Sequence, residues 1–249
     1  MQIQLVRNAT LRLSLGGVTF LIDPWLAAKG QGESYAGQES SPLVDLPMPI
    51  AEIIDGVDAV IVSHLHSDHF DEVAQQTLPK AIPLLCHPRD AEAIRATGFL
   101  DVRPIEAGFE FAAVSIATMD GQHGPEEVLE DMGEVTGFVF RTAGEPVLYW
   151  AGDTILYPAV ERVIAEEQPE VIVVHACGAM WIGQGPIVMD AEMALQTARL
   201  SGTAKVVTTH LEAVDHGVID RAALKAAAAA DPVVGARIKI PADGETLVF

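Results

Sequence analysis

Cysteine is almost absent from this chain, which has 249 residues and only Cys86 and Cys177. Neither stands in a Cys-x-x-Cys pair, so a structural zinc site built on cysteine is excluded. In a reducing compartment the two residues are most simply buried small hydrophobic side chains.

Basic residues are also scarce. The chain has 15 Lys and Arg against 35 Asp and Glu, which gives a formal net charge of −20. Proteins that bind nucleic acid neutralise phosphates with Lys and Arg, so this balance argues against a nucleic-acid partner. We expect a small-molecule substrate, and one with a single phosphate stays possible because bound cations could attract it.

Long apolar runs are missing too, although hydrophobic residues make up 49% of the chain and the mean hydropathy is +0.27. No run approaches the ~18–20 residues of a membrane span, so we expect no membrane partner. The N-terminus lacks the basic and then apolar segments of a secretory signal, which predicts a cytoplasmic protein. The high apolar content leaves a homo-oligomer possible.

The apolar periodicity predicts strands first, and strands alternating with helices afterwards. Strands are expected at 2–6, 10–15, 18–22, 59–62, 82–86, 102–105, 109–117, 136–141, 146–151, 171–175, 205–209, 237–240 and 246–249. Helices are expected at 71–77, 89–97, 158–167, 190–201 and 220–230. Two strand-rich halves with helices in each predict a layered α/β sandwich. No linker interrupts the pattern, so residues 1–249 are expected to form a single domain.

The densest cluster of potential metal ligands is the segment 64–69, with the sequence His-Leu-His-Ser-Asp-His. It follows the apolar strand 59–62, at the end of the sheet where ligands bind in α/β proteins. Residues two apart in an extended segment point the same way, so His64 and His66 can reach one metal ion together. Asp68 and His69 follow as the chain turns into the next helix, where they can face a second ion.

Three later residues stand at turns or strand ends: His123 between glycines, Asp153 after the strand 146–151, and His210 after the strand 205–209. Each has an ordinary alternative when taken alone, because a strand-end Asp often forms a turn or caps a helix. Combined with the segment 64–69 they form a more specific pattern.

That pattern resembles the metallo-β-lactamase superfamily, which is marked by His-x-His-x-Asp-His after a strand and then by a lone His, a lone Asp and a last His. Within the superfamily the chain looks similar to stand-alone bacterial members related to the ascorbate-6-phosphate lactonase group. The features behind this placement are Arg-Asn-Ala-Thr at 7–10, Asp-Gly-Gln-His-Gly at 120–124 and His-Leu-Glu-Ala-Val-Asp-His at 210–216. The resemblance implies a four-layer αββα sandwich.

The resemblance also implies a role for each matching residue, all of them ligands of two divalent ions. The first ion would be held by His64, His66 and His123, the second by Asp68, His69 and His210, and both by Asp153. Zn²⁺ is the expected metal, with Mn²⁺ or Fe²⁺ as alternatives, because a ligand set without thiolate does not require zinc.

Such a pair of ions would activate a bridging hydroxide for hydrolysis. Asp68 is the expected catalytic residue that orients this nucleophile. His216 is the candidate proton donor to the leaving group, with an ordinary surface histidine as the alternative.

Two other polar residues follow strands. Asp23 could hold a ligand histidine by its free N–H, or simply form a turn with Pro24. His175 could support the metal site or be a histidine of the core.

Specificity is expected to lie in the loop 27–49, which could form a lid, and around residues 177–189. Met180 and Trp181 could line a substrate pocket or simply pack.

Several functions compete at this point, because the fold does not fix the substrate. The main prediction is a metal-dependent hydrolase of a small lactone, ester or phosphoester. A β-lactamase of the same superfamily is one alternative, which the missing secretory signal and the missing cysteine ligand argue against. A nuclease of the same superfamily is another, which the net negative charge argues against. A non-hydrolytic di-iron redox protein or a metal-binding protein without turnover is the alternative from another class.

Overall fold

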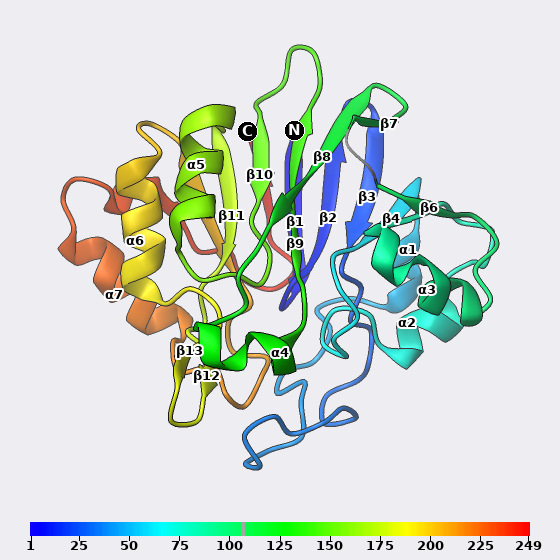
Figure 1. Ribbon diagram of the computed structural model, residues 1–249, viewed down its shortest axis with the longest axis horizontal. Coiled ribbons are helices and arrows are strands. Elements are labelled where there is room, and N and C mark those ends of the chain that lie inside the picture. Colours follow the sequence, from blue (N-terminus) through cyan, green and yellow to red (C-terminus); the bar gives the residue numbers. More distant parts are fainter. Residues whose placement is uncertain (106–107) are drawn as a thin grey trace.

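The computed structural model describes residues 1–105 and 108–249, and its core is a pair of seven-stranded sheets (Figure 1). The first sheet has the strand order β16-β1-β2-β3-β4-β5-β6. Its strands are β1 (Gln2–Arg7), β2 (Thr10–Leu15), β3 (Val18–Ile22), β4 (Ala59–Val62), β5 (Leu84–Cys86), β6 (Val102–Pro104) and β16 (Thr246–Val248). Pairing is antiparallel from β16 to β3 and parallel from β3 to β6.

The second sheet mirrors this division, with the order β15-β14-β11-β10-β9-β8-β7. Its strands are β7 (Phe109–Phe111), β8 (Val114–Asp120), β9 (Thr136–Arg141), β10 (Leu148–Trp150), β11 (Val171–His175), β14 (Lys205–Thr209) and β15 (Ile238–Lys239). Pairing is parallel from β15 to β10 and antiparallel from β10 to β7. A separate hairpin consists of β12 (Met180–Trp181) and β13 (Gly185–Pro186).

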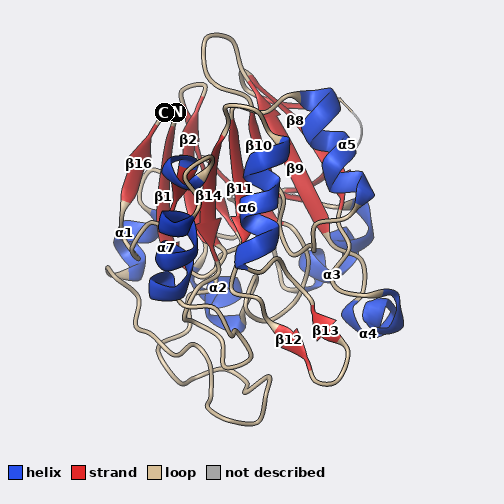
Figure 2. Cartoon of the chain, turned by 90° about the vertical axis from the view of Figure 1, so that its left-hand side faces the viewer, coloured by secondary structure: helices blue, strands red, loops and turns tan. Residues whose placement is uncertain are grey.

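Helices cover the outer face of each sheet, as Figures 1 and 2 show. The first sheet packs against α1 (Ile50–Ile54), α2 (Glu72–Thr77) and α3 (Ala91–Ala96), and the second against α5 (Pro158–Glu167), α6 (Ala191–Leu200) and α7 (Arg221–Ala230). The short α4 (Leu129–Met132) lies near the β12–β13 hairpin. The layers therefore run αββα, which confirms the expected fold class.

The alternation of side chains along the central strands explains why both sheets are covered on both faces. In β10, Leu148 and Trp150 join the core between the sheets, whereas Tyr149 joins the core under the helices. The inter-sheet core is rich in aromatic contacts, such as Phe138 stacked on Trp150 with ring centroids 5.7 Å apart. Strands buried on both faces are apolar, and the sequence shows this pattern at β4 and in the first four residues of β11, before His175.

Most of the predicted elements are present, but the single strand expected at 109–117 was wrong. The chain turns at Ala112, where φ is +52°, and returns as β8, so this segment is the hairpin β7–β8. Alanine gives no turn signal, which is why the pattern looked continuous. Among the described residues, no helix has both the length and the apolar character needed to cross a membrane.

Candidate metal centre

Six strand ends deliver polar side chains to one edge of the sandwich, at the bottom of Figure 1. The strands β3, β4, β10, β11 and β14 are parallel within their sheets, so their carboxyl ends point the same way. β8 runs in the same direction as β10, because both are antiparallel to β9. The residues at these ends are Asp23, His64, His123, Asp153, His175 and His210.

The histidine segment folds back on itself directly after β4. The amides of His69 and Phe70 both donate to the carbonyl of His66, at 3.0 and 3.1 Å. Asp71 then caps α2 by accepting a hydrogen bond from the Ala74 amide at 2.9 Å. This turn brings the rings of His64 and His69 to within 4.1 Å of each other between centroids.

Four side chains meet at the first position predicted for a metal ion. Each of His64, His66, His123 and Asp153 offers a ligand atom that lies within 4.8 Å of the other three. The Oδ2 atom of Asp153 is 3.2 Å from Nε2 of His123 and 3.8 Å from Nε2 of His64. These are the residues expected for the first ion, together with the expected bridging carboxylate.

The second group shares Asp153 and includes His69, His175 and His210, whose ligand atoms again lie within 4.8 Å of one another. Asp68 borders this group through Oδ2, which lies 3.1 Å from Nε2 of His210 and 3.7 Å from Nε2 of His69. All seven residues expected as ligands therefore come together around the Asp153 carboxylate.

His175 is part of this site rather than an isolated histidine of the core. Its Nδ1 atom lies 2.5 Å from Oδ1 of Asp153, and both side chains are buried. The contact fixes the orientation of the Asp153 carboxylate, whose Oδ2 faces His69 at 3.2 Å. His175 thus supports the residue that links the two groups.

The buried carboxylate of Asp23 orients the histidine segment. Asp23 accepts hydrogen bonds from the Ser63 amide at 2.8 Å, from the Ser63 hydroxyl at 2.7 Å and from Nδ1 of His69 at 2.7 Å. Ser63 Oγ is also 2.9 Å from Nδ1 of His64. Of the two alternatives for Asp23, the structure supports contact with a histidine of the motif. Holding the Nδ1 proton of His69 leaves its Nε2 free to face the centre.

Other histidines of the site have supports that the sequence did not reveal. Nδ1 of His123 donates to the carbonyl of Ile187 at 2.8 Å, and Nδ1 of His210 lies 3.4 Å from Sγ of Cys177. Asn8 reaches across with Nδ2, which is 3.3 Å from Oδ2 of Asp68 and 3.1 Å from Nε2 of His210. Cys177 lies outside the quoted motifs, and Asn8 belongs to the feature 7–10 but has no predicted role there, so only the fold reveals their contacts with the site.

The site contains both neutral and protonated imidazoles. Burial lowers the pKa of His123 to about 4 and that of His64 well below its usual value, so both are neutral. Burial opposes protonation of His69 as well, but Asp153, Asp68 and Asp23 outweigh it and raise its pKa to about 10. Around Asp68 the effect of burial is likewise overcome, by His69 and His210, and its pKa is lowered.

These side chains fit divalent cations of the borderline class. Within the described part of the chain, Nε2 of His64 and Nε2 of His175 are buried without a hydrogen-bond partner. An unpaired buried polar atom is costly, and a cation would supply the missing partner for His64. Neutral imidazole and carboxylate are suitable donors for such ions.

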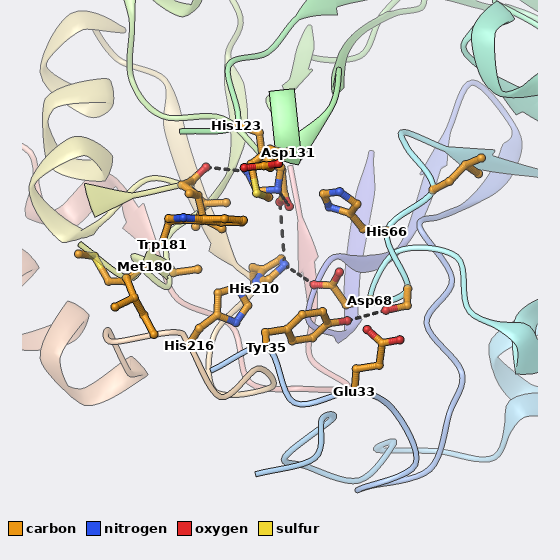
Figure 3. A pocket seen from close by; sticks show the side chains of 18 residues that line it. Glu33, Tyr35, His66, Asp68, His123, Asp131, Met180, Trp181, His210 and His216 are labelled. Atoms are coloured by element: carbon orange, nitrogen blue, oxygen red, sulfur yellow. Dashed lines mark hydrogen bonds and ion pairs between the residues drawn. The ribbon is translucent and has the colours of Figure 1, made fainter. Parts of the chain in front are cut away.

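A cavity of about 600 Å³ opens over this centre (Figure 3). Its walls are largely apolar and come from Leu65, Met132, Met180, Trp181, Ile182, Ile187 and Val188. Met180 and Trp181 therefore line the pocket, in line with the first of the two alternatives for them. The charged lining outside the histidines is acidic, with Glu33, Asp68, Asp131 and Asp153, and the described lining contains no Lys or Arg.

His216 and Tyr35 lie next to each other in the lining of the cavity (Figure 3). Their rings lie 5.0 Å apart between centroids, and the Tyr35 hydroxyl is 2.7 Å from Ser67 Oγ. Burial lowers the pKa of His216, so this imidazole is neutral at neutral pH. Burial and the nearby Asp68 raise the pKa of Tyr35, which keeps its phenol protonated.

Comparison with known proteins agrees with this geometry. The profile of the β-lactamase superfamily domain matches residues 19–211. The chain belongs to this superfamily, and it is a metal-dependent hydrolase of the metallo-β-lactamase fold.

Among its relatives is the UPF0173 protein YddR of Bacillus subtilis, which is 39% identical over the full length of both chains. Two solved structures are similar throughout. An isothiocyanate hydrolase from Delia radicum gut bacteria has a TM-score of 0.94 and 35% identity, covering 100% of this chain and 99% of that one. A possible metal-dependent hydrolase from Veillonella parvula has a TM-score of 0.96 and 31% identity, with the same coverage.

Proposed function

We propose that residues 1–249 form one catalytic domain that binds two divalent cations, with zinc as the expected metal and manganese or iron as alternatives. His64, His66 and His123 would hold the first ion, and Asp68, His69 and His210 the second. Asp153 would bridge them. The observation that carries this proposal is the meeting of two ligand groups at the single carboxylate of Asp153.

Bound ions would supply Lewis acidity and would lower the pKa of a shared water. The side chains of the cavity would orient the water and move protons. Asp68 lies at the border of the cavity, where its carboxylate can accept a hydrogen bond from the attacking water and orient it. His216 faces the same cavity and is our candidate for proton exchange with the leaving group. Because it is neutral, it can take up a proton and pass it on.

The cavity favours a small, neutral electrophile. An anionic substrate would face Glu33 and Asp131 without a basic side chain in the described lining. Phosphate recognition ordinarily uses Arg or Lys, so a phosphoester fits this pocket less well than an ester, a lactone or a heterocumulene. The isothiocyanate hydrolase that is 35% identical makes an isothiocyanate the first compound to test.

The test starts from protein stripped with a chelator and reloaded with zinc. We expect mass spectrometry to find two ions per chain, and turnover of an alkyl isothiocyanate, a lactone or a p-nitrophenyl ester. Asp153→Asn is expected to lose metal and activity, while His87→Ala, a change at a half-buried histidine outside the cavity, is expected to keep both.

Each alternative gives a different result. Saturation below two ions per chain would contradict the dinuclear site. Turnover of a phosphoester alone would contradict the neutral substrate class, and turnover of nitrocefin alone would indicate a β-lactamase. Two iron ions without any hydrolysis would favour the redox alternative.

A further inference from the structure

One carboxylate holds the loop that borders the cavity. Asp215 accepts hydrogen bonds from the Ser34 hydroxyl at 2.6 Å and from the amide of Tyr35 at 2.8 Å. The amides of Ala36, Gln38 and Glu39 also donate to it, at distances between 3.0 and 3.3 Å. Five donors from residues 34–39 therefore converge on a side chain that directly precedes His216.

This arrangement places the Tyr35 side chain, which is 36% exposed, in the lining of the cavity over the candidate metal centre. Figure 3 shows its ring between His216 and Asp68, with the hydroxyl pointing toward the histidine segment. The hydroxyl lies 2.7 Å from Oγ of Ser67, the residue between His66 and Asp68. Three chain segments distant in sequence thus meet at the phenol.

The hydrogen bond between Tyr35 and Ser67 does not require the phenol proton, which is therefore available to a substrate. Each of the two hydroxyls has one proton, and either can be the donor of the Tyr35–Ser67 bond. When Ser67 donates, Tyr35 accepts, and its own proton can point into the cavity that both residues line. Burial and the nearby Asp68 raise the pKa of the phenol and keep it neutral, so it can donate a hydrogen bond but does not add negative charge.

A donor of this kind is needed because hydrolysis builds negative charge on the oxygen, sulfur or nitrogen of the attacked group. Donors aimed at developing charge are among the strongest contributions to catalysis. The described lining offers no Lys or Arg for this task.

We propose that the Tyr35 hydroxyl donates a hydrogen bond to the heteroatom on which negative charge develops, and that Asp215 is the positioning residue that holds Tyr35 there. This inference rests on the proposed function. The phenol keeps its proton throughout the reaction.

Tyr35→Phe tests the first part, with Tyr157→Phe as the matched control. Tyr157 also has a bonded hydroxyl, which donates to the Asp120 carbonyl at 3.1 Å, but it lies outside the cavity lining. We expect kcat of Tyr35→Phe to fall about 100-fold with KM changed less than about twofold, as for removal of one oxyanion donor. Acetohydroxamate, a small metal-binding probe, should bind the zinc-loaded variant about tenfold more weakly, a loss of about 1.4 kcal/mol. Zinc content and melting temperature should stay at the wild-type values.

Asp215→Asn tests the second part without any turnover. The amide cannot accept all five donors, so residues 34–39 should loosen and the protease Glu-C should cleave after Glu39 at least about tenfold faster. Asp231→Asn is the matched control, because Asp231 also accepts backbone amides, from Val233 and Val234, at another surface. In the double variant with Tyr35→Phe, kcat should fall no further than in the worse single variant, because both changes remove the same interaction.

The outcomes separate this inference from the proposed function. Wild-type kcat and wild-type hydroxamate affinity in Tyr35→Phe would overturn the role of Tyr35 while leaving the hydrolase intact. Unchanged cleavage and unchanged kcat in Asp215→Asn would overturn the role of Asp215. A wild-type protein that binds no hydroxamate would overturn both proposals. One that binds hydroxamate but hydrolyses none of the panel would contradict the proposed substrates alone, since the affinity ratio still reports on Tyr35.

Discussion

Asp23 lies next to the histidine segment with no exposed surface. Replacing it with asparagine keeps the shape of the side chain but changes which hydrogen-bond donors it can accept. Its Oδ2 atom accepts from both the Ser63 hydroxyl and Nδ1 of His69. An amide has only one acceptor oxygen, so either its oxygen or its N–H group must stand opposite Nδ1 of His69. If the N–H group faces Nδ1, the proton of His69 moves to Nε2, where it blocks metal binding.

The size of the effect follows from these contacts. Loss of an outer carboxylate partner typically weakens metal affinity about 10- to 100-fold, which corresponds to about 1.4–2.7 kcal/mol. Hydrogen bonds to a charged group contribute about 1.5–3 kcal/mol each, so we expect Asp23→Asn to lose about 2 kcal/mol of folding stability as well. For a chain of this size that lowers the melting temperature by about 4–8 °C.

Zinc affinity is measured by competition with a chromophoric chelator, and stability by thermal melting of the metal-free protein. Asp58→Asn is the matched control, because Asp58 accepts a single hydrogen bond, from the Thr19 amide at 2.8 Å, at the exposed end of β4. If Asp23→Asn binds both zinc ions as tightly as the wild type, Asp23 does not set the tautomer of His69 and the reasoning fails.

Three further outcomes are expected. Cys177→Ala removes the contact with Nδ1 of His210 and should weaken binding of one of the two zinc ions severalfold. If the chelator assay gives wild-type affinities for both ions, this expectation is contradicted. Zinc affinity should rise by about tenfold per pH unit for each displaced proton between pH 6 and pH 8, because the raised pKa of His69 means that a cation must displace its proton; a flat profile would show that no proton leaves. Arg7→Met should destabilise the fold by about 3 kcal/mol in urea, because the buried guanidinium donates to the carbonyls of Trp25 and Ala27 at 2.9 Å each; a loss below about 1 kcal/mol would contradict this.

The sequence predicted the parts of the molecule that follow a periodic pattern. The strands 10–15, 18–22, 59–62, 136–141, 171–175 and 205–209 and the helix 158–167 have the observed bounds. These segments are apolar on one or two faces, so burial alone determines them. The candidate ligand residues could be predicted for a related reason, since polar side chains directly after buried strands are unusual, and the structure brings them together.

Other features depend on contacts that the sequence does not encode locally. The hairpin β12–β13 has only two residues per strand, and α1 and α4 have five and four, too short for any periodic signal. Asn8 and Cys177 join the site only through the docking of distant strands. The Tyr35–Ser67 contact likewise needs a loop conformation that no local pattern determines.

The proposed ligands follow strands of both sheets, so bound ions would link one sheet to the other. His64 and His69 follow a strand of the first sheet, and Asp153 and His210 follow strands of the second. Neither sheet alone carries all the proposed ligands, so binding of the proposed ions would be coupled to the packing of one sheet on the other. At an ion concentration 1,000 times Kd this coupling would add about 4 kcal/mol to stability. When zinc is added, the hydrogen exchange of backbone amides should then slow down in the strands of both sheets, and by a similar factor, because the bound ions would hold the two sheets together.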